Sequence, residues 1–367
     1  MARPATVVID SSALQHNLSI VQSRSPKAKI LAMIKANGYG HGSVIVAKAL
    51  AKADAFGVCC IEEALELRAA GITHPVVLME GVFKSEELTL AAEQQFEIVV
   101  HHLQQVEQLE QATLPNPLKV WLKLDTGMHR LGFTPNIFLQ AYQRLLNCPQ
   151  VFPTLKLMTH FSSSDELDSD TTIQQAKLFE EITKNLPGEK SLSNSGGILG
   201  WQNSAVFAGQ NIQDDWVRPG LMLYGLSPFA GTCGRDFDLK PVMTLRSELI
   251  AIHQLNKGER VGYGGKFTCP ESMKIGTVAM GYADGYPRNA GNGTTVLVNH
   301  KPVSLIGRVS MDMLAVDLRT QPNAKVGNEV ILWGQDLPME LIAFAAGQSV
   351  YEIASSVHQR LPMVIAW

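Results

Sequence analysis

The sequence predicts a (β/α)₈ barrel followed by a C-terminal, mostly-β domain. Two observations predict the barrel: eight strand-sized apolar runs follow one another before residue 235, and helix-like stretches fill most gaps between them. A third predicts the second domain, because from Pro241 onward short β-branched runs recur between Gly, Pro and Asn turns. No GxGxxG follows any of the strands, which disfavours an open dinucleotide-binding sheet.

The elements of the first part follow in order. A strand over 5–10 leads into a helix over 11–24, which Ser11 or Ser12 can cap. The barrel strands are expected near 29–34, 55–60, 75–79, 96–100, 118–124, 154–159, 190–194 and 216–223. Helices are expected over 42–52, 62–70, 84–94, 101–112, 135–146 and 171–186. Gly71 stands where a glycine that ends a helix belongs. Segment 196–215 predicts an irregular helix and a loop.

The second part reads as a compact β-domain with one helix near 338–346. Its strands are expected at 242–252, 274–280, 294–298, 302–308, 313–318 and 329–333. We therefore divide the chain into a barrel over 11–235 and a β-domain over 236–367. We expect the N-terminal strand, within residues 1–10, to join the β-domain.

Composition describes an ordinary globular protein with a large core: 367 residues, 46% hydrophobic and 18% charged. A net charge of −3 gives no electrostatic reason to expect nucleic acid or an anionic membrane as a partner. The start lacks the pattern of a signal peptide, and the apolar runs are too short to span a membrane. Five scattered cysteines are typical of reduced thiols, so we expect a cytoplasmic protein.

An apolar strand ends on Lys35, and the chain then enters a glycine-rich turn over 36–42. A lysine held at the end of a strand can bond to a cofactor aldehyde, and the N–H groups of the turn can hold a phosphate. Pyridoxal phosphate needs both of these groups. Considered alone, however, the motif is more simply explained as a solvated lysine before a turn.

Other polar residues also end predicted barrel strands, and chemistry in such barrels belongs at these ends. Singly, each has a structural explanation: a capped turn at Asp125, a core histidine at His160, a salt bridge at Arg218. Their number on one predicted face favours an active site. The residues are Lys35, Lys123, Asp125, Arg130, Thr159, His160, Ser162, Asn194, Ser195, Arg218, Gly220 and Leu221.

Over essentially its whole length the chain resembles an alanine racemase of the pyridoxal-phosphate barrel type. Seven motifs carry the resemblance, in the order expected for that family. They are IKANGYGHG at 34–42, KLDTGMHRLG at 123–132, VRPGLMLYG at 217–225, VGYGG at 261–265, GYADGY at 281–286, GRVSMDM at 307–313 and YE at 351–352.

The resemblance implies two acid–base groups that flank the substrate, because racemisation removes the α-proton from one face and returns one to the other. Lys35 is one, and also binds the cofactor; Tyr263 is the other. A phenol has an ordinary pKa near ~10, so a cation must lower it, and the pair of His160 and Arg218 is the family's candidate. The implied phosphate contacts are Tyr39, Ser195, Tyr351, Gly220 and Leu221.

In the resembled family Arg218 meets the pyridine nitrogen of the cofactor. An arginine keeps its proton, so the ring stays largely neutral, which suits an enzyme that returns the proton to the α-carbon. Arg130 is implied to pair with the ring phenolate and the substrate carboxylate. Lys123 can carry a carbamate in relatives, which positions this arginine.

The resemblance also implies a homodimer in which Tyr263, Tyr282, Met311 and Asp312 enter the partner's active site. Tyr282 and Tyr351 narrow the entrance, so a small amino acid, alanine, is the expected substrate. The product, D-alanine, would serve peptidoglycan synthesis or alanine catabolism. One departure is Ser195-Gly-Gly in place of Ser-Ala-Ala, which predicts a looser phosphate-binding end.

Three alternatives stay open. The first is a broad-specificity or serine racemase of the same family. The second is a basic amino acid decarboxylase with a related barrel and β-domain, but the β-domain lacks its catalytic-cysteine motif, and Cys269 sits in Phe-Thr-Cys-Pro. The third is a non-catalytic pyridoxal-phosphate carrier, which would resemble the barrel alone.

Overall fold

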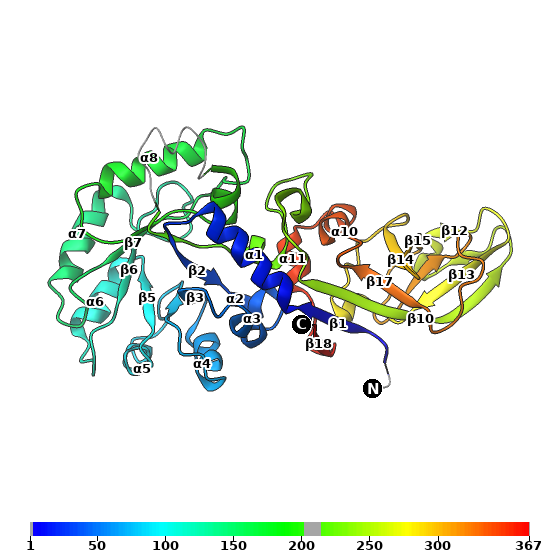
Figure 1. Ribbon diagram of the computed structural model, residues 1–367, viewed down its shortest axis with the longest axis horizontal. Coiled ribbons are helices and arrows are strands. Elements are labelled where there is room, and N and C mark those ends of the chain that lie inside the picture. Colours follow the sequence, from blue (N-terminus) through cyan, green and yellow to red (C-terminus); the bar gives the residue numbers. More distant parts are fainter. Residues whose placement is uncertain (1–2, 202–213, 367) are drawn as a thin grey trace.

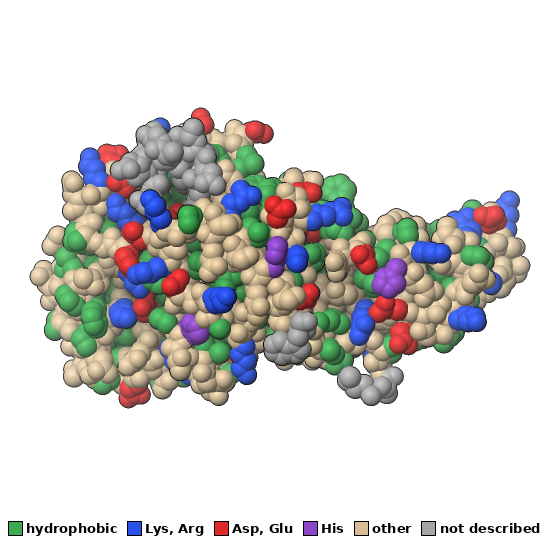
Figure 2. All heavy atoms as spheres, in the orientation of Figure 1, with side chains coloured by type: hydrophobic (Ala, Val, Ile, Leu, Met, Phe, Trp, Pro, Cys, Tyr) green, Lys and Arg blue, Asp and Glu red, His purple; other side chains and the backbone are tan. Residues whose placement is uncertain are grey.

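The computed structural model describes residues 3–201 and 214–366, and shows two bodies end to end along the longest axis of the molecule (Figure 1). The first body is a parallel β-barrel surrounded by helices, and the second is rich in antiparallel strands. Acidic and basic side chains are interspersed over the face drawn in Figure 2. Among the described residues, no helix is both long and apolar enough to cross a membrane.

The predicted eight-stranded barrel is confirmed, and its strands run parallel in chain order. Backbone hydrogen bonds from Asp215 to Lys190 and from Arg218 to Ser193, both 2.9 Å, join the last strand to the one before it. The last strand also pairs with the first. The barrel strands are β2 (Lys29–Met33), β3 (Ala55–Val58), β4 (Val76–Leu78), β5 (Glu97–Val100), β6 (Val120–Lys123), β7 (Lys156–Met158), β8 (Lys190–Ser191) and β9 (Trp216–Val217).

Helices pack around the barrel through apolar stripes. In α7 (Pro135–Leu146), for example, Phe138, Ala141, Tyr142 and Leu145 are buried at helical spacing. The others are α1 (Ser11–Arg24), α3 (Ser43–Ala49), α4 (Ile61–Ala69), α5 (Glu87–Glu93), α6 (Leu103–Gln111) and α8 (Thr171–Thr183). Inside the barrel, side chains fill the centre, so the interior is a core: Leu31, Met33, Ala55, Val77, Val99, Trp121, Met158 and Trp216.

The cap expected for α1 is wrong. Asp10 is the N-cap, and its carboxylate accepts the N–H of Ala13 at 3.0 Å. Asp10 ends the preceding strand in an extended conformation, which is the backbone geometry that an N-cap needs. Ser12 instead donates its hydroxyl to the Asp10 carboxylate at 2.6 Å.

The β-domain is built on one eight-stranded sheet. The long strand β10 (Met243–Leu255) pairs first with β17 and then, after a bulge, with β13, so part of the sheet closes on itself. The strand β1 (Thr6–Asp10) lies between β10 and β18 (Met363–Ala366). The other strands are β13 (Met273–Val278), β14 (Thr295–Val298), β15 (Lys301–Ile306), β16 (Leu314–Asp317) and β17 (Glu329–Trp333).

The expected strand over 216–223 is wrong in its second half. β9 ends at Val217, and Leu221–Tyr224 form a short 3₁₀ helix. Pro219 has no N–H to donate, and Gly220 turns the chain with φ −123° and ψ −92°. The apolar residues after this turn are buried in either conformation, which is why they resemble a strand.

Several elements are too short for a periodic pattern to predict them. They are α2 (Lys35–Tyr39), β11 (Arg260–Val261), β12 (Phe267–Thr268), α11 (Val350–Ser355) and the strand β18. The expected helix near 338–346 is present as α10 (Met339–Ala346). Within the expected irregular segment 196–215, Gly197–Trp201 form a π-helical turn, and 202–213 lie outside the described residues.

Candidate active site

Lys35 is placed two residues beyond the end of β2 and begins α2, which is a left-handed turn. Ala36, Asn37 and Tyr39 have φ values of 52°, 53° and 52°, and Gly38 has 61°. Each residue with a Cβ costs about 1–2 kcal/mol in this region. The turn therefore stores strain directly beside Lys35, and contacts from outside it must offset that strain.

Hydrogen bonds within the chain hold this turn. The N–H of Gly40 donates to the carbonyl of Ala36 at 3.0 Å, and that of Gly42 to the carbonyl of Asn37 at 2.9 Å. The N–H of Ala36 donates to the carboxylate of Glu63 at 2.7 Å. The sequence predicts phosphate-binding N–H groups here, but these three already have partners. A phosphate therefore needs other donors.

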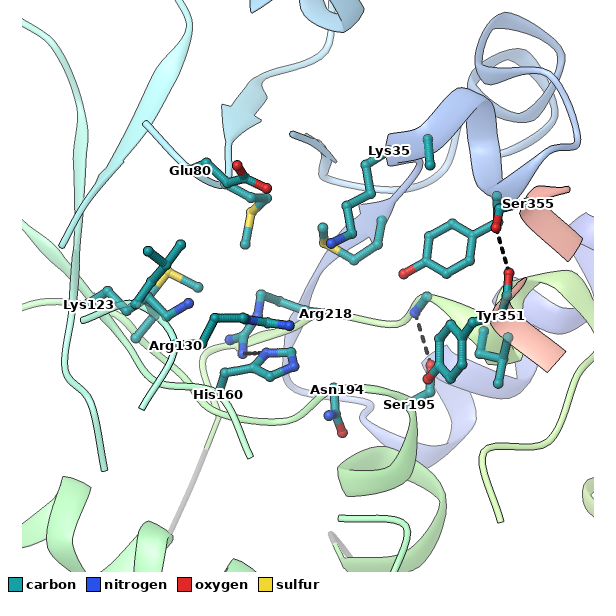
Figure 3. A pocket seen from close by; sticks show the side chains of 18 residues that line it. Lys35, Glu80, Lys123, Arg130, His160, Asn194, Ser195, Arg218, Tyr351 and Ser355 are labelled. Atoms are coloured by element: carbon teal, nitrogen blue, oxygen red, sulfur yellow. Dashed lines mark hydrogen bonds between the residues drawn. The ribbon is translucent and has the colours of Figure 1, made fainter. Parts of the chain in front are cut away.

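A cavity of about 640 Å³ lies at the C-terminal ends of the barrel strands, and Figure 3 shows Lys35 pointing into it. Most of the predicted site residues line it: Lys35, Tyr39, Lys123, Arg130, His160, Ser195, Arg218, Gly220, Leu221 and Tyr351. Glu80 and Ser355, which are not among the residues predicted from the sequence, line it too. Glu80 lies just beyond the C-terminal end of β4, where catalytic residues of such barrels are expected, so its position after a predicted strand could have indicated it.

One end of the cavity carries hydroxyl groups. The Ser195 oxygen accepts the N–H groups of Gly220 at 2.9 Å and Met222 at 3.3 Å, which leaves its own hydrogen to donate to a ligand. A Cβ on Gly220 would lie 2.6 Å from the hydroxyl oxygen of Tyr39. The position requires glycine because the tyrosine hydroxyl comes this close to the backbone.

Two phenols complete this end. Tyr39 stacks on Tyr224 with ring centroids 4.8 Å apart, and lies 6.2 Å from the ring of Tyr351. Burial raises the pKa of Tyr39 far above its ordinary value, and raises the pKa of Tyr351 to about 12. Both phenols are therefore protonated at neutral pH. Together with Ser195 they offer three O–H donors to an anion.

The two glycines after Ser195 fit tightly. A Cβ on Gly196 would lie 2.7 Å from the Ser164 hydroxyl oxygen, and one on Gly197 would lie 2.9 Å from the Cβ of Ser193. Ser164 and Ser193 approach the two glycines too closely for alanine side chains, which explains why the sequence has Ser-Gly-Gly in place of Ser-Ala-Ala.

Gly196→Ala should destabilise the fold by about 1–3 kcal/mol, because the added methyl group overpacks this site. Helix propensity alone predicts the opposite sign, a gain of about 1 kcal/mol. Urea unfolding measures the difference. Gly291→Ala is the matched control, since a Cβ there meets no atom within 4 Å. A more stable Gly196→Ala variant would show that the segment is loose.

Arg218 lies at the other end, just after β9, and is only 2% exposed. Its guanidinium donates to the Ser191 hydroxyl at 2.5 Å and to the carbonyls of Thr159 and Leu192 at 2.5 and 3.1 Å. Burial lowers its pKa to about 10, so the group stays protonated at neutral pH. The structure thus fixes a cation that donates hydrogen bonds and releases no proton.

His160 lies beside this cation. Arg218 Nη2 faces its Nδ1 at 3.4 Å, so Nδ1 is the acceptor and the ring proton belongs on Nε2. Desolvation, followed by the charges of Arg218 and Lys123, holds the pKa of His160 well below its ordinary value. The imidazole is therefore neutral, and the charge of this pair resides on Arg218.

Lys123 ends β6 and is 6% exposed. Burial lowers its pKa to about 7, with further contributions from Arg218, Arg130 and Lys35, while Asp125 opposes the shift. Near neutral pH a substantial fraction of this amine is therefore uncharged. Several cationic side chains thus lie close together here with few carboxylates nearby. An anionic ligand bound in the cavity would neutralise part of this positive charge.

This burial predicts a pH-dependent stability. Between about pH 7 and the ordinary value of 10.5, the unfolded chain carries the Lys123 proton and the folded chain does not. The free energy of unfolding should therefore rise with pH across this window. Lys123→Met should remove that contribution, so its stability advantage over the parent is largest at or below pH 7. Denaturant unfolding of cofactor-free protein in buffers freed of carbon dioxide, where Lys123 is an unmodified amine, tests this, with exposed Lys48→Met as the control. An advantage that is constant with pH would contradict the prediction.

Four predicted site residues lie in the β-domain and do not line the cavity: Tyr263, Tyr282, Met311 and Asp312. Tyr263 stands in the turn between β11 and β12. Figure 1 shows β12 at the end of the β-domain far from the barrel. Tyr263, Tyr282 and Met311 are 70%, 38% and 55% exposed. Large apolar side chains exposed in this way are typical of a surface that binds another molecule.

An ion cluster around the buried Asp284 holds two of these loops together. The Tyr282 N–H donates to the Ser310 carbonyl at 3.0 Å, next to Met311. Beneath them, Asp284 is fully buried and pairs with Arg3 and with Arg360, the latter at 2.8 Å. Arg360 also reaches the carboxylate of Asp312 at 2.8 Å. These contacts therefore hold the loops that carry the exposed Tyr282 and Met311 in a fixed position.

Two family models match the chain in order. The model described as "Alanine racemase, N-terminal domain" matches residues 9–228, and "Alanine racemase, C-terminal domain" matches 242–365. The chain belongs to the alanine racemase family.

Relatives agree along nearly the whole length. An alanine racemase of Shewanella putrefaciens is 47% identical over 358 residues, 98% of each chain. One of Vibrio parahaemolyticus is 47% identical over 361 residues, 98% of this chain and 99% of the relative. The structure of biosynthetic alanine racemase from Pseudomonas aeruginosa aligns with a TM-score of 0.94 at 41% identity, covering 100% of both chains. The structure of alanine racemase from Acinetobacter baumannii aligns with a TM-score of 0.92 at 41% identity, and the alignment covers 99% of this chain and 100% of that one. The racemase fold predicted from the sequence is thereby confirmed.

Proposed function

We propose that this chain interconverts L-alanine and D-alanine with pyridoxal 5′-phosphate bound to Lys35. The family supports the reaction, and one observation carries the assignment of the site. The cavity combines a lysine at a strand end, three hydroxyl donors at one end and a buried arginine at the other. That combination suits an aldehyde cofactor with a phosphate group and a ring nitrogen.

The residues present fit this cofactor. Tyr39, Ser195 and Tyr351, with the backbone N–H of Leu221, would hold its phosphate. Gly220 would line the phosphate, while its own N–H supports the Ser195 oxygen at 2.9 Å. Arg218 would donate to the ring nitrogen, because it lines the cavity at the end opposite the hydroxyl groups. His160 would contact the ring and Arg130 its phenolate. When bound, the cofactor withdraws electrons from the substrate's Cα and so acidifies its hydrogen.

We assign the proton transfers to Lys35 and Tyr263, one on each face of the substrate's Cα. One side chain accepts the α-proton, and the other delivers a proton to the opposite face. Arg130 orients the substrate carboxylate, and its fork suits such an anion. A neutral Lys123 is the form that reacts with carbon dioxide, which supports a carbamate there that positions Arg130.

We propose a homodimer with shared active sites. Tyr263 is exposed, does not line the cavity and directly precedes β12, which lies far from the barrel (Figure 1), so a second chain would bring a Tyr263 to the cavity. In a two-fold dimer each barrel would meet the partner's β-domain, which makes two equal sites. Met311, Asp312 and Tyr282 would enter with it and leave room for a small amino acid.

The experiment is direct: purified protein with added pyridoxal phosphate is incubated with L-alanine, and D-alanine is measured by chiral chromatography. Formation of D-alanine is expected. Faster racemisation of L-serine or L-lysine would instead favour a serine or broad-specificity racemase. Release of carbon dioxide would favour a decarboxylase, and cofactor binding without turnover would favour a carrier.

We place the enzyme in the cytoplasm, where its five free thiols would stay reduced. Its D-alanine would supply peptidoglycan synthesis or belong to alanine catabolism. A deletion strain distinguishes the two roles. Dependence on added D-alanine for growth would indicate wall synthesis, whereas failure to grow on alanine as carbon source would indicate catabolism.

A further inference from the structure

Two adjacent cysteines lie at the active-site end of the barrel. Cys59 and Cys60 follow β3 directly, and Glu63 lies in the first turn of α4, whose N-cap is Cys60. The two sulfur atoms and a carboxylate oxygen of Glu63 all lie within 4.8 Å of one another. All three side chains are half-buried, so an ion can reach them from solvent. Among the described residues, no other group of three Cys, His, Asp or Glu meets this spacing.

The donor set is one that soft divalent cations bind. Thiolate sulfur selects Zn²⁺ and its soft relatives, and a carboxylate is an accepted additional ligand. With Zn–S bonds of about 2.3 Å, two sulfurs on a tetrahedral ion lie about 3.8 Å apart, which is within the 4.8 Å that bounds the present spacing. Solvent can supply the fourth ligand.

Both cysteines are protonated thiols before a metal binds. Burial, followed by the charge of Glu63, raises the pKa of Cys59 to about 12, and burial also raises that of Cys60. Each sulfur therefore releases its proton to solvent as its bond to the metal forms. No oxidant or reductant takes part.

The cluster is coupled to the cofactor lysine through Glu63. One carboxylate oxygen accepts the N–H of Ala36 at 2.7 Å, and the other accepts the N–H of Cys59 at 2.9 Å. Ala36 follows Lys35 and is the first strained residue of the left-handed turn. A cation on this carboxylate withdraws electron density from the oxygen that holds Ala36, which weakens the support of the turn.

We propose that Cys59, Cys60 and Glu63 form a site for one thiophilic divalent cation, and that its occupation inhibits the enzyme by displacing the turn at Lys35. The proposal that these residues bind a metal does not depend on the proposed racemase reaction. The inhibition rests on the proposed racemase function.

Binding is tested on the holoenzyme with cadmium chloride, because cadmium–thiolate bonds absorb in the ultraviolet. The absorbance should saturate at one equivalent. Cys59→Ser and Cys60→Ser should each weaken binding at least about tenfold, since each removes one of two sulfur ligands. Cys233→Ser, which changes a half-buried cysteine outside the cluster, is the control and should bind as the parent does. Unchanged absorbance in both serine variants, or none in the parent, would overturn the site.

The coupling is tested by the activity of each protein with cadmium relative to its own activity without it. We expect inhibition of the parent and of Cys233→Ser, with relief in Cys59→Ser and Cys60→Ser. Stoichiometric binding without inhibition would overturn the coupling to Lys35. A protein that binds cadmium but lacks racemase activity would overturn the proposed function and leave the metal site standing.

Discussion

Lys35→Ala should lose the visible absorbance of lysine-bound cofactor and about 10³-fold or more of its racemase activity. The change removes both the covalent attachment and one of the two acid–base groups, each of which contributes substantially to such reactions. Activity is measured as D-alanine formation, and the spectrum is recorded after dialysis against excess pyridoxal phosphate.

The matched control is Lys48→Ala on the neighbouring helix α3, where the lysine is exposed. It should keep the parent's spectrum and turnover. A parental spectrum in Lys35→Ala would show that another amine holds the cofactor, and Lys123 would be the next candidate because its depressed pKa leaves a neutral nucleophile.

Co-refolding Lys35→Ala with Tyr263→Phe should restore activity that neither variant has alone. Random pairing makes about half the dimers mixed, and each mixed dimer holds one intact site and one doubly damaged site. The mixture should therefore reach about a quarter of the parental activity. Differently tagged chains, purified through both tags, confirm that mixed dimers are present.

The control is a pair damaged in the same domain, Lys35→Ala with Arg130→Ala. Every mixed dimer of this pair still has one barrel lesion at each site, so it should stay inactive. If the Lys35 and Tyr263 pair stays equally inactive despite proven mixing, each site is contained within one chain.

Local sequence predicted much of the barrel, because its strands and helices have clear apolar patterns. It also predicted which polar residues gather, since Lys35, Arg218 and Ser195 all lie at strand ends and meet in one cavity. It missed the left-handed path after Lys35, which depends on distant contacts such as that from Glu63. It misread Leu221–Tyr224 as strand because burial alone does not distinguish strand from 3₁₀ helix. It also predicted a loose phosphate-binding end from Gly196 and Gly197, whereas Ser164 and Ser193 leave no room there for a side chain.

The position of β1 has a consequence for biosynthesis. Val7 pairs with Leu245 and also with Met363, so β1 leaves the ribosome long before either of its neighbours. At about 5–20 residues per second, the wait for β10 alone is roughly 12–50 seconds. During that time β1 offers unpaired edges on both sides while the barrel assembles behind it. β1 is thus exposed to aggregation until β10 and β18 have been made, and their completion, rather than that of the barrel, ends the exposure.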